Sequence, residues 1–296
     1  MRLKGVFAGR SGWFQLLIFL LCLLGGMILA NLISLLLYGV GGFSPEEALQ
    51  NVHLLRLSQF IAAVTVFLCP ALATAWLCSD RPVEYLSVGK LPDRKVFLPT
   101  LLSVALLSPV ITLLGFFNQK MVLPSFLEPL ERWMQSLEAA AESLTLRFFA
   151  DNDPLSILLN VAVIAAVAGI TEEFLFRGAL QRILEKRFTS HHTVIWIAAV
   201  VFSTVHMQFY GFLPRLLLGA YFGYLLYWTR SIWVPVFAHF VHNGIAVAGM
   251  SKAEWRENEF VSGEISGAGL PPLIICSLLS LFLFYFCVVY LRKSRA

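Results

Sequence analysis

The sequence predicts an all-α membrane protein that crosses the bilayer about eight times. Of its 296 residues, 58% are hydrophobic and only 14% are charged, whereas charged residues make up about a quarter of a soluble domain. The apolar residues form eight runs, each near or above the roughly 20 residues that a helix needs to cross the hydrocarbon. These runs lie at residues 13–38, 58–78, 96–117, 155–184, 192–210, 212–229, 232–249 and 271–291. We therefore expect a single membrane domain over residues 1–296.

The loops between these runs alternate in charge. Basic residues gather before the first run, at 79–95, after the fourth run and in the C-terminal tail, whereas acidic residues gather at 118–153 and 251–270. By the positive-inside rule, both termini are expected in the cytoplasm. The first run is too long for the apolar part of a signal peptide, so it is expected to remain as a helix. We thus expect an integral multi-pass protein of a bacterial cytoplasmic membrane.

The connection 118–153 is the longest stretch outside the apolar runs. Its apolar residues have helical spacing, with acidic residues between them, which predicts an amphipathic helix at the membrane surface. A substrate lid is the alternative interpretation. The residues that carry this spacing are Glu128, Leu130, Trp133, Met134, Leu137 and Leu144.

Two adjacent glutamates, Glu172 and Glu173, interrupt the fourth apolar run. A carboxylate inside a membrane helix is costly and usually marks function. Arg177 follows Glu173 by four residues, so the two share a helix face in the favourable order and can pair. Glu172 lies about 100° round the helix and lacks such a cation. One acid can therefore be neutralised structurally while the other is left for chemistry.

Almost all other polar residues within the runs also lie between 172 and 243. Phe202 and His206 are four apart in the fifth run, as are His239 and Asn243 in the seventh, so each pair lies on one helix face. Counted at 1.5 Å per residue from the cytoplasmic helix ends, these groups and the glutamates lie about 12–22 Å deep. We therefore expect one site buried among helices four, five and seven.

Several residues in this region also have purely structural interpretations. A single membrane histidine often only bonds a neighbouring helix, which suits His242 because it lies off the face of the other polar residues. Arg215 is interpreted as an anchor whose charged end reaches the membrane surface. Gly219 and Gly223 form a GxxxG motif, which permits close helix packing.

The three motifs together resemble the CPBP family, the CAAX proteases and bacteriocin-processing enzymes, also called Abi. This family includes the type II CAAX prenyl endopeptidases, and its pattern is EExxxR, then FxxxH, then HxxxN on successive helices. Here the pattern is complete at 172–177, 202–206 and 239–243. The resemblance implies an eight-helix intramembrane glutamate protease whose catalytic core covers residues 155–250.

The chemistry of these residues agrees with an intramembrane endopeptidase. Peptide hydrolysis needs a base to activate water and donors where the oxyanion forms, and no Ser or Cys has an evident nucleophile setting. Glu172 is expected to be the base, assisted by His206, with His239 and Asn243 donating to the oxyanion. The supporting residues are Glu173, Arg177 and Phe202. The expected partners are the membrane and an unidentified peptide or protein substrate, and no nucleic acid.

Two alternatives stay open. Two histidines and a glutamate are also a known zinc set, and the family is often labelled metalloprotease, so a zinc-dependent version is the first alternative. HExxH is absent and the five cysteines show no CxxC spacing, so we expect no metal or other cofactor. The second alternative is a non-catalytic protein, such as an immunity or interaction factor, or a transporter with a proton-relay carboxylate. A transporter usually shows inverted repeats, and none is evident.

Overall fold

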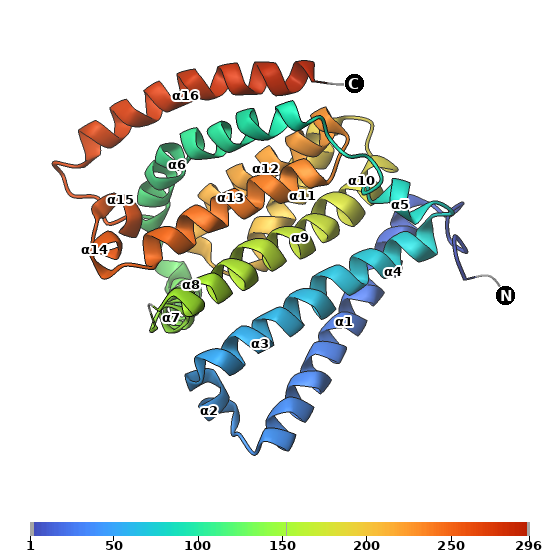
Figure 1. Ribbon diagram of the computed structural model, residues 1–296, viewed down its shortest axis with the longest axis horizontal. Coiled ribbons are helices and arrows are strands. Elements are labelled where there is room, and N and C mark those ends of the chain that lie inside the picture. Colours follow the sequence, from blue (N-terminus) through green and yellow to red (C-terminus); the bar gives the residue numbers. More distant parts are fainter. Residues whose placement is uncertain (1–2, 152, 295–296) are drawn as a thin grey trace.

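The computed structural model is all-α and describes residues 3–151 and 153–294, none of which lies in a strand (Figure 1). The ends of the predicted domain 1–296, and residue 152 of the connection 118–153, lie outside this part. The longer α-helices are α1 (Gly12–Gly41), α3 (Val52–Ala62), α4 (Cys69–Cys78), α6 (Phe97–Gln119), α7 (Glu128–Phe148), α11 (His191–Val205), α12 (Phe212–Thr229), α13 (Trp233–Met250) and α16 (Leu270–Lys293). The shorter ones are α2 (Pro45–Gln50), α5 (Pro82–Tyr85), α8 (Pro154–Asn160), α9 (Ala168–Glu173), α10 (Gln181–Glu185), α14 (Ala253–Arg256) and α15 (Glu259–Ser262). The π-helical segments are η1 (Ala63–Leu68), η4 (Val161–Val167) and η5 (Phe174–Leu180), and the 3₁₀ turns are η2 (Arg94–Val96), η3 (Ser125–Leu127) and η6 (Phe209–Gly211).

Six helical stretches in the described part are long and apolar enough to cross a membrane. They are Gly12–Gly41, Val52–Cys78, Arg94–Gln119, Pro154–Glu185, Phe209–Thr229 and Leu270–Lys293. These stretches confirm an all-α polytopic membrane protein.

The fifth and seventh predicted crossings are too short or too polar to be counted among these stretches. Run 192–210 forms only the 15-residue helix α11, because the helix ends at Val205. Run 232–249 forms the 18-residue helix α13, in which two histidines and an asparagine lower the mean hydropathy. Eight crossings therefore stay a prediction.

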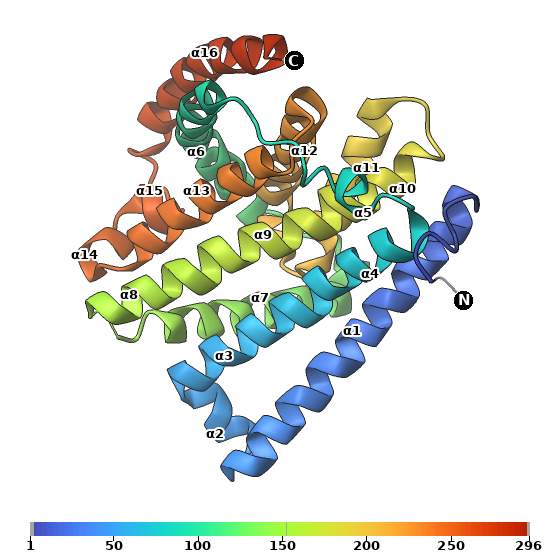
Figure 2. The same ribbon diagram turned by 45° about the vertical axis from the view of Figure 1, so that its right-hand side comes forward.

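The stretch Pro154–Glu185 is a continuous helix that contains two π-helical segments. It runs through α8, η4, α9, η5 and α10, so that a π segment flanks α9 on each side. A π turn contains an extra residue, which rotates the side chains that follow it around the helix axis. Both glutamates lie in α9, which Figures 1 and 2 show between α13 and the helix formed by α3 and α4.

Close helix packing brings the site residues together. A Cβ atom at Gly169 would lie 3.2 Å from the backbone nitrogen of Phe240, so α9 and α13 pack backbone to backbone. A Cβ atom at Gly219, the first glycine of the GxxxG motif, would lie 3.0 Å from the ring of Phe202, so α12 packs closely on α11. Larger residues at either glycine would push apart the helices that carry the polar side chains.

The remaining helices flank this centre. Figure 2 shows α1 with α3 and α4 on one flank, and α6 with α16 on the other. A large buried apolar cluster includes most of the segment from Phe174 to Leu184, directly after the glutamates. The polar site therefore lies within the bundle core.

The predicted connection 118–153 contains helix α7, of which only Met134 and Phe148 are buried. Its position at a membrane surface stays a prediction. Its C-terminal end is tied to the bundle, because Arg56 on α3 donates to the carbonyl of Phe148. Arg56 is only 4% exposed and lies within the stretch Val52–Cys78. The sequence interpretation missed this buried charge, because the apolar run begins only at residue 58 whereas the helix begins earlier.

Candidate active site among helices α9, α11 and α13

Glu173 is the centre of a buried ion network. Its side chain is 0% exposed, and its Oε1 accepts from Nη1 of Arg177 at 2.9 Å and from Nδ1 of His239 at 2.8 Å. Nη2 of Arg177 donates to the carbonyl of Gly219 at 2.9 Å. The spacing of four predicted the pair with Arg177, but not the link to His239. Glu173 therefore joins α9 to α13 and fixes the orientation of the His239 ring.

Aromatic rings enclose this network. The guanidinium carbon of Arg177 lies 4.5 Å from the ring centroid of Phe202 and 5.5 Å from that of Phe222, within range of cation–π attraction. The ring of Phe222 stacks on His239, with centroids 5.1 Å apart. Phe202 also contacts His206, at 4.9 Å between centroids. These rings keep water away from the ion pair, which strengthens it.

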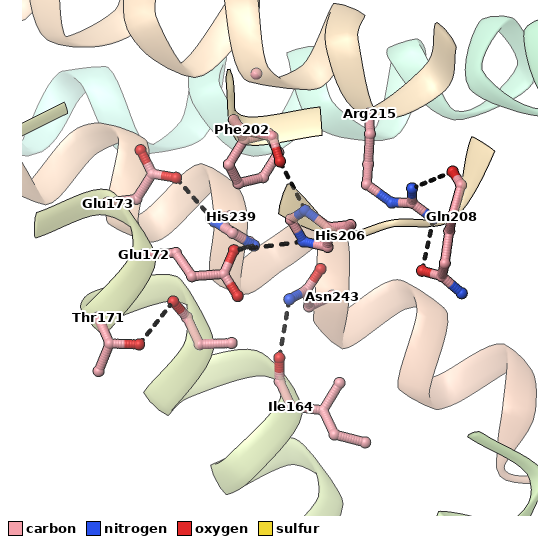
Figure 3. A network of polar contacts seen from close by, with 12 residues as sticks. Ile164, Thr171, Glu172, Glu173, Phe202, His206, Gln208, Arg215, His239 and Asn243 are labelled. Carbon is pink, nitrogen blue, oxygen red and sulfur yellow. Dashed lines mark hydrogen bonds and ion pairs between the residues drawn. The ribbon is translucent and has the colours of Figure 1, made fainter. Parts of the chain in front are cut away.

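Glu172 faces a gap between two histidines (Figure 3). Its Oε2 lies 3.9 Å from Nε2 of His206 and 3.9 Å from Nε2 of His239, which is too far for a direct hydrogen bond. The Glu172 side chain is 14% exposed, and its Oε2 has no hydrogen-bond partner in the described part of the chain. A buried carboxylate oxygen and two ring nitrogens therefore face one another without a direct hydrogen bond.

In both histidines, Nδ1 is hydrogen-bonded to an oxygen on the side of the ring away from Glu172. Nδ1 of His239 donates to Glu173, and Nδ1 of His206 donates to the carbonyl of Phe202 at 2.7 Å. Because carboxylate and carbonyl oxygens only accept, each Nδ1 carries a proton. In the neutral ring, Nε2 then presents its lone pair towards Glu172.

His206 begins a tight loop directly after α11. The next residue, Met207, has a φ of 54°, which is uncommon for a residue with a side chain. Arg215 holds the loop by donating to the carbonyl of Gln208 at 2.9 Å and to its side-chain oxygen at 2.8 Å. The sequence interpreted Arg215 as a membrane anchor, whereas the structure gives it two bonds to the loop that carries His206.

Asn243 lies one turn beyond His239 on α13, on the same helix face. Its Nδ2 donates to the carbonyl of Ile164 in η4 at 2.8 Å (Figure 3). An amide has two N–H bonds, and this contact uses one of them. The structure thus brings Glu172, His206 and His239 together and anchors Asn243 one turn away.

Sequence reasoning missed several partners of the predicted residues. The carbonyls of Gly219 and Ile164 are backbone groups, so residue type gives no signal for them. The π segments on both sides of α9 also leave no compositional trace, although π turns recur at functional sites. Gln208 carries a signal that the sequence does show, because it is a polar side chain two residues after His206.

The donor types here fit zinc, but their spacing does not. Zinc takes histidine nitrogens and carboxylate oxygens, and bonds of 2.0–2.2 Å place neighbouring donors about 3.4 Å apart. Oε2 of Glu172 lies 3.9 Å from each histidine nitrogen. No group of three or more His, Cys, Asp or Glu among the described residues has the geometry to hold a metal ion. We therefore derive no step through a metal.

Comparison with known proteins places this site in a family segment. Residues 154–245 match the family model described as "Type II CAAX prenyl endopeptidase Rce1-like". Over 89 residues the chain is 33% identical to the "Putative membrane peptidase YdiL" of Bacillus subtilis (strain 168). The aligned segment is 30% of this chain and 36% of that protein. Over 90 residues it is 24% identical to the "Uncharacterized protein YpbD" of the same organism, which covers 29% of this chain and 43% of that protein. No solved structure matches the chain.

The matched segment contains all three motifs, from Glu172 to Asn243. It confirms the predicted resemblance to the CAAX protease and bacteriocin-processing family over residues 154–245, and that family indicates a membrane peptidase. The chain spans less than half the length of the two curated relatives.

Proposed function

We propose that this protein is an intramembrane endopeptidase that hydrolyses a peptide bond with a water molecule activated by Glu172. One observation carries the proposal. Oε2 of Glu172, a buried oxygen without a hydrogen-bond partner among the described residues, faces Nε2 of His206 and of His239 at 3.9 Å each. In this proposal the attacking water lies within hydrogen-bond distance of the Glu172 carboxylate and of Nε2 of His206. General-base catalysis requires a base within hydrogen-bond reach of the proton that it removes.

The reaction begins with proton transfer to Glu172. As the carboxylate removes one water proton, the water oxygen bonds to the carbonyl carbon of the substrate, and the carbonyl oxygen becomes an oxyanion. Nε2 of His206 can accept from the second water hydrogen and so orient the nucleophile. Glu172 then returns its proton to the amide nitrogen, and the carbon–nitrogen bond breaks to give an acid and an amine.

Two donors are available to the oxyanion. The N–H of Asn243 that does not contact Ile164 is one. Nε2 of His239 is the other when this ring has taken up a proton from solvent before the reaction, so that both of its nitrogens carry hydrogen. Glu173 and Arg177 support this role, because the Glu173 carboxylate holds the opposite ring nitrogen of His239. Donors fixed before the reaction stabilise the developing charge without reorganisation.

Purified protein, a peptide library and mass spectrometry test the proposal. The wild type and Glu142→Gln should yield the same cleavage products, because Glu142 is an exposed residue on α7. Glu172→Gln keeps the shape but removes the base, so its products should disappear. Cleavage by Glu172→Gln at the wild-type rate would show that Glu172 is not the base. It would favour the alternative in which the site only binds, as in an immunity or interaction factor.

Removal of Asn243 tests the oxyanion role. Asn243→Ala should lower kcat by roughly 10²–10³-fold, the scale of one oxyanion donor. Asn31→Ala is the matched control, because that amide also donates to a backbone carbonyl but lies exposed on α1. Equal activity of the two variants would remove Asn243 from the mechanism.

Chelation separates the carboxylate mechanism from its zinc-dependent alternative. If Glu172 alone activates water, cleavage should persist after treatment with a chelator. If the chelator abolishes cleavage and added zinc restores it, the zinc-dependent mechanism is established instead, with Glu172, His206 and His239 as the ligands.

We also propose eight crossings with both termini in the cytoplasm of a bacterium. The proposal rests on the charge of the loops and requires α11 and α13 to cross despite their length or polarity. A reporter active only in the cytoplasm should be active when fused after Arg187 or at the C-terminal end, and silent after Glu257. Activity after Glu257 would contradict this topology.

A further inference from the structure

A cavity lies at the opposite end of α11 from His206. Its volume is about 480 Å³, and it lies where α11 begins and where α12 and α16 end. Figures 1 and 2 both show these three helix ends together at one end of the bundle. The 15 residues of α11 separate the cavity from His206 by about 22 Å. The lining residues are His191, His192, Tyr224, Tyr227, Trp228 and Arg292.

The walls of this cavity are aromatic rings that hold one another. The rings of His191 and Tyr227 stack, with centroids 4.1 Å apart and planes 3° apart. The rings of Tyr224 and Trp228 also stack, at 5.4 Å and 24°. Nδ1 of His192 is hydrogen-bonded to the Tyr224 hydroxyl. The cavity is therefore largely formed before any ligand binds, as is usual for small-molecule sites.

The polar groups of the lining favour an anion. They are imidazole, phenol, indole and guanidinium groups, all of which can donate hydrogen bonds, and no lining residue is an Asp or a Glu. Arg230 adds a cation nearby, with its guanidinium carbon 5.3 Å from the ring centroid of Tyr227. Guanidinium groups bind phosphate oxygens in a bidentate manner. A phosphate is thus the anion that this lining suits.

We propose that the cavity binds the phosphate headgroup of an anionic phospholipid. It lies at the ends of two candidate membrane spans, Phe209–Thr229 and Leu270–Lys293. Trp and Tyr are enriched at the level of lipid headgroups, and basic pockets between membrane helices bind such headgroups.

An apolar strip on α16 supports a lipid over a soluble phosphate. Tyr285, Leu281 and Leu278 precede Arg292 by 7, 11 and 14 residues, so they share its helix face. Their exposed fractions are 61%, 41% and 63%. Acyl chains of a lipid whose headgroup contacts Arg292 can therefore lie along this strip, which a soluble phosphate would leave unused.

Titration calorimetry of the full chain in detergent tests this proposal, with phosphatidylglycerol, phosphatidylcholine and inorganic phosphate as probes. At 0.3 M salt the Debye length is about 6 Å, so exposed charges are largely screened. Phosphatidylglycerol should bind. Phosphatidylcholine is zwitterionic, because its own choline cation accompanies the phosphate, and it should bind at least about tenfold more weakly. Arg292→Gln should weaken phosphatidylglycerol binding by about tenfold, the scale of one hydrogen-bonded charge.

Lys293→Gln is the matched control, because it removes the same charge from the next residue, which does not line the cavity. It should change the affinity by less than about twofold, and the double variant His191→Gln/His192→Gln should resemble Arg292→Gln. The melting temperature without added lipid checks that each variant is folded. Equal losses in the Arg292 and Lys293 variants would assign binding to general surface charge. Inorganic phosphate that binds as tightly as the lipid would make the cavity a soluble-anion site. Either result overturns the proposal.

Discussion

Among the described residues, two arginine side chains are buried in this bundle, and they are accommodated in different ways. Arg177 is 1% exposed and donates to the carboxylate of Glu173 and to the carbonyl of Gly219. Arg56 is 4% exposed, and among the described side chains no carboxylate forms an ion pair with it. Its acceptors are all neutral: Asn160 Oδ1 at 2.9 Å, Ser156 Oγ at 3.4 Å and the Phe148 carbonyl at 3.4 Å.

The difference shows what Glu173 contributes. Because Arg56 is buried with neutral acceptors alone, a carboxylate is not required simply to bury an arginine in this bundle. Glu173 also binds His239, so the charge of Arg177 is linked through the carboxylate to an imidazole that faces Glu172. The Arg56 contacts instead reach Phe148 at the end of α7. We therefore assign the Arg177 network to the candidate site and the Arg56 network to the scaffold.

The largest expected effect on stability comes from Arg177→Ala. This change leaves the buried Glu173 carboxylate without its cation, which should lower the free energy of unfolding by about 3–5 kcal/mol. Thermal or denaturant unfolding in detergent measures the loss, and activity should fall with it. A protein of wild-type stability but without activity would place Arg177 in contact with substrate.

Arg56→Ala should have a smaller effect. It removes the donor to Asn160 Oδ1 and Ser156 Oγ, whereas the Phe148 carbonyl keeps its bond from the Asn160 amide. The cost should be about 1–3 kcal/mol, and the α7 end should loosen. The kcat of the folded fraction should stay within about threefold of the wild type, because the Arg56 contacts do not reach Glu172, His206 or His239. A large loss of kcat at unchanged stability would tie α7 to the reaction.

The smallest change in stability is expected when both members of the ion pair are replaced. Replacing a buried pair with neutral residues of similar size is often nearly neutral, so Glu173→Gln/Arg177→Met should unfold within about 1 kcal/mol of the wild type. Its kcat should still fall by about tenfold, because a neutral amide replaces the charged partner of His239. If the double variant is as unstable as Arg177→Ala, the unpaired charge of Glu173 is not the cause of the stability lost in Arg177→Ala.

The sequence predicted features that depend on local spacing. The pair of Glu173 with Arg177 follows from four intervening steps on one helix, and the shared face of His239 and Asn243 follows in the same way. Apolar runs located the six candidate spans, because these are defined by length and composition alone. The family motifs then indicated which polar residues belong together.

Features that depend on tertiary packing or on single backbone turns escaped prediction. The bond from His239 to Glu173 joins residues 66 positions apart, and no local pattern encodes it. The end of α11 at Val205 depends on a loop in which Met207 has a positive φ. Arg56 was missed because it precedes an apolar run, although the helix extends around it.

The most direct test of the central claim compares the two adjacent glutamates. We claim that Glu172 activates water, whereas Glu173 is the structural acid. Glu172→Gln should lower kcat by roughly 10²–10⁴-fold, the range of general-base loss, at a nearly unchanged melting temperature. Glu173→Gln should lower the melting temperature clearly, because Arg177 then lacks a buried counter-charge. The measurement is kcat and melting temperature of both variants, side by side with the wild type. An active Glu172→Gln together with a stable, inactive Glu173→Gln would contradict the assignment and exchange the two roles.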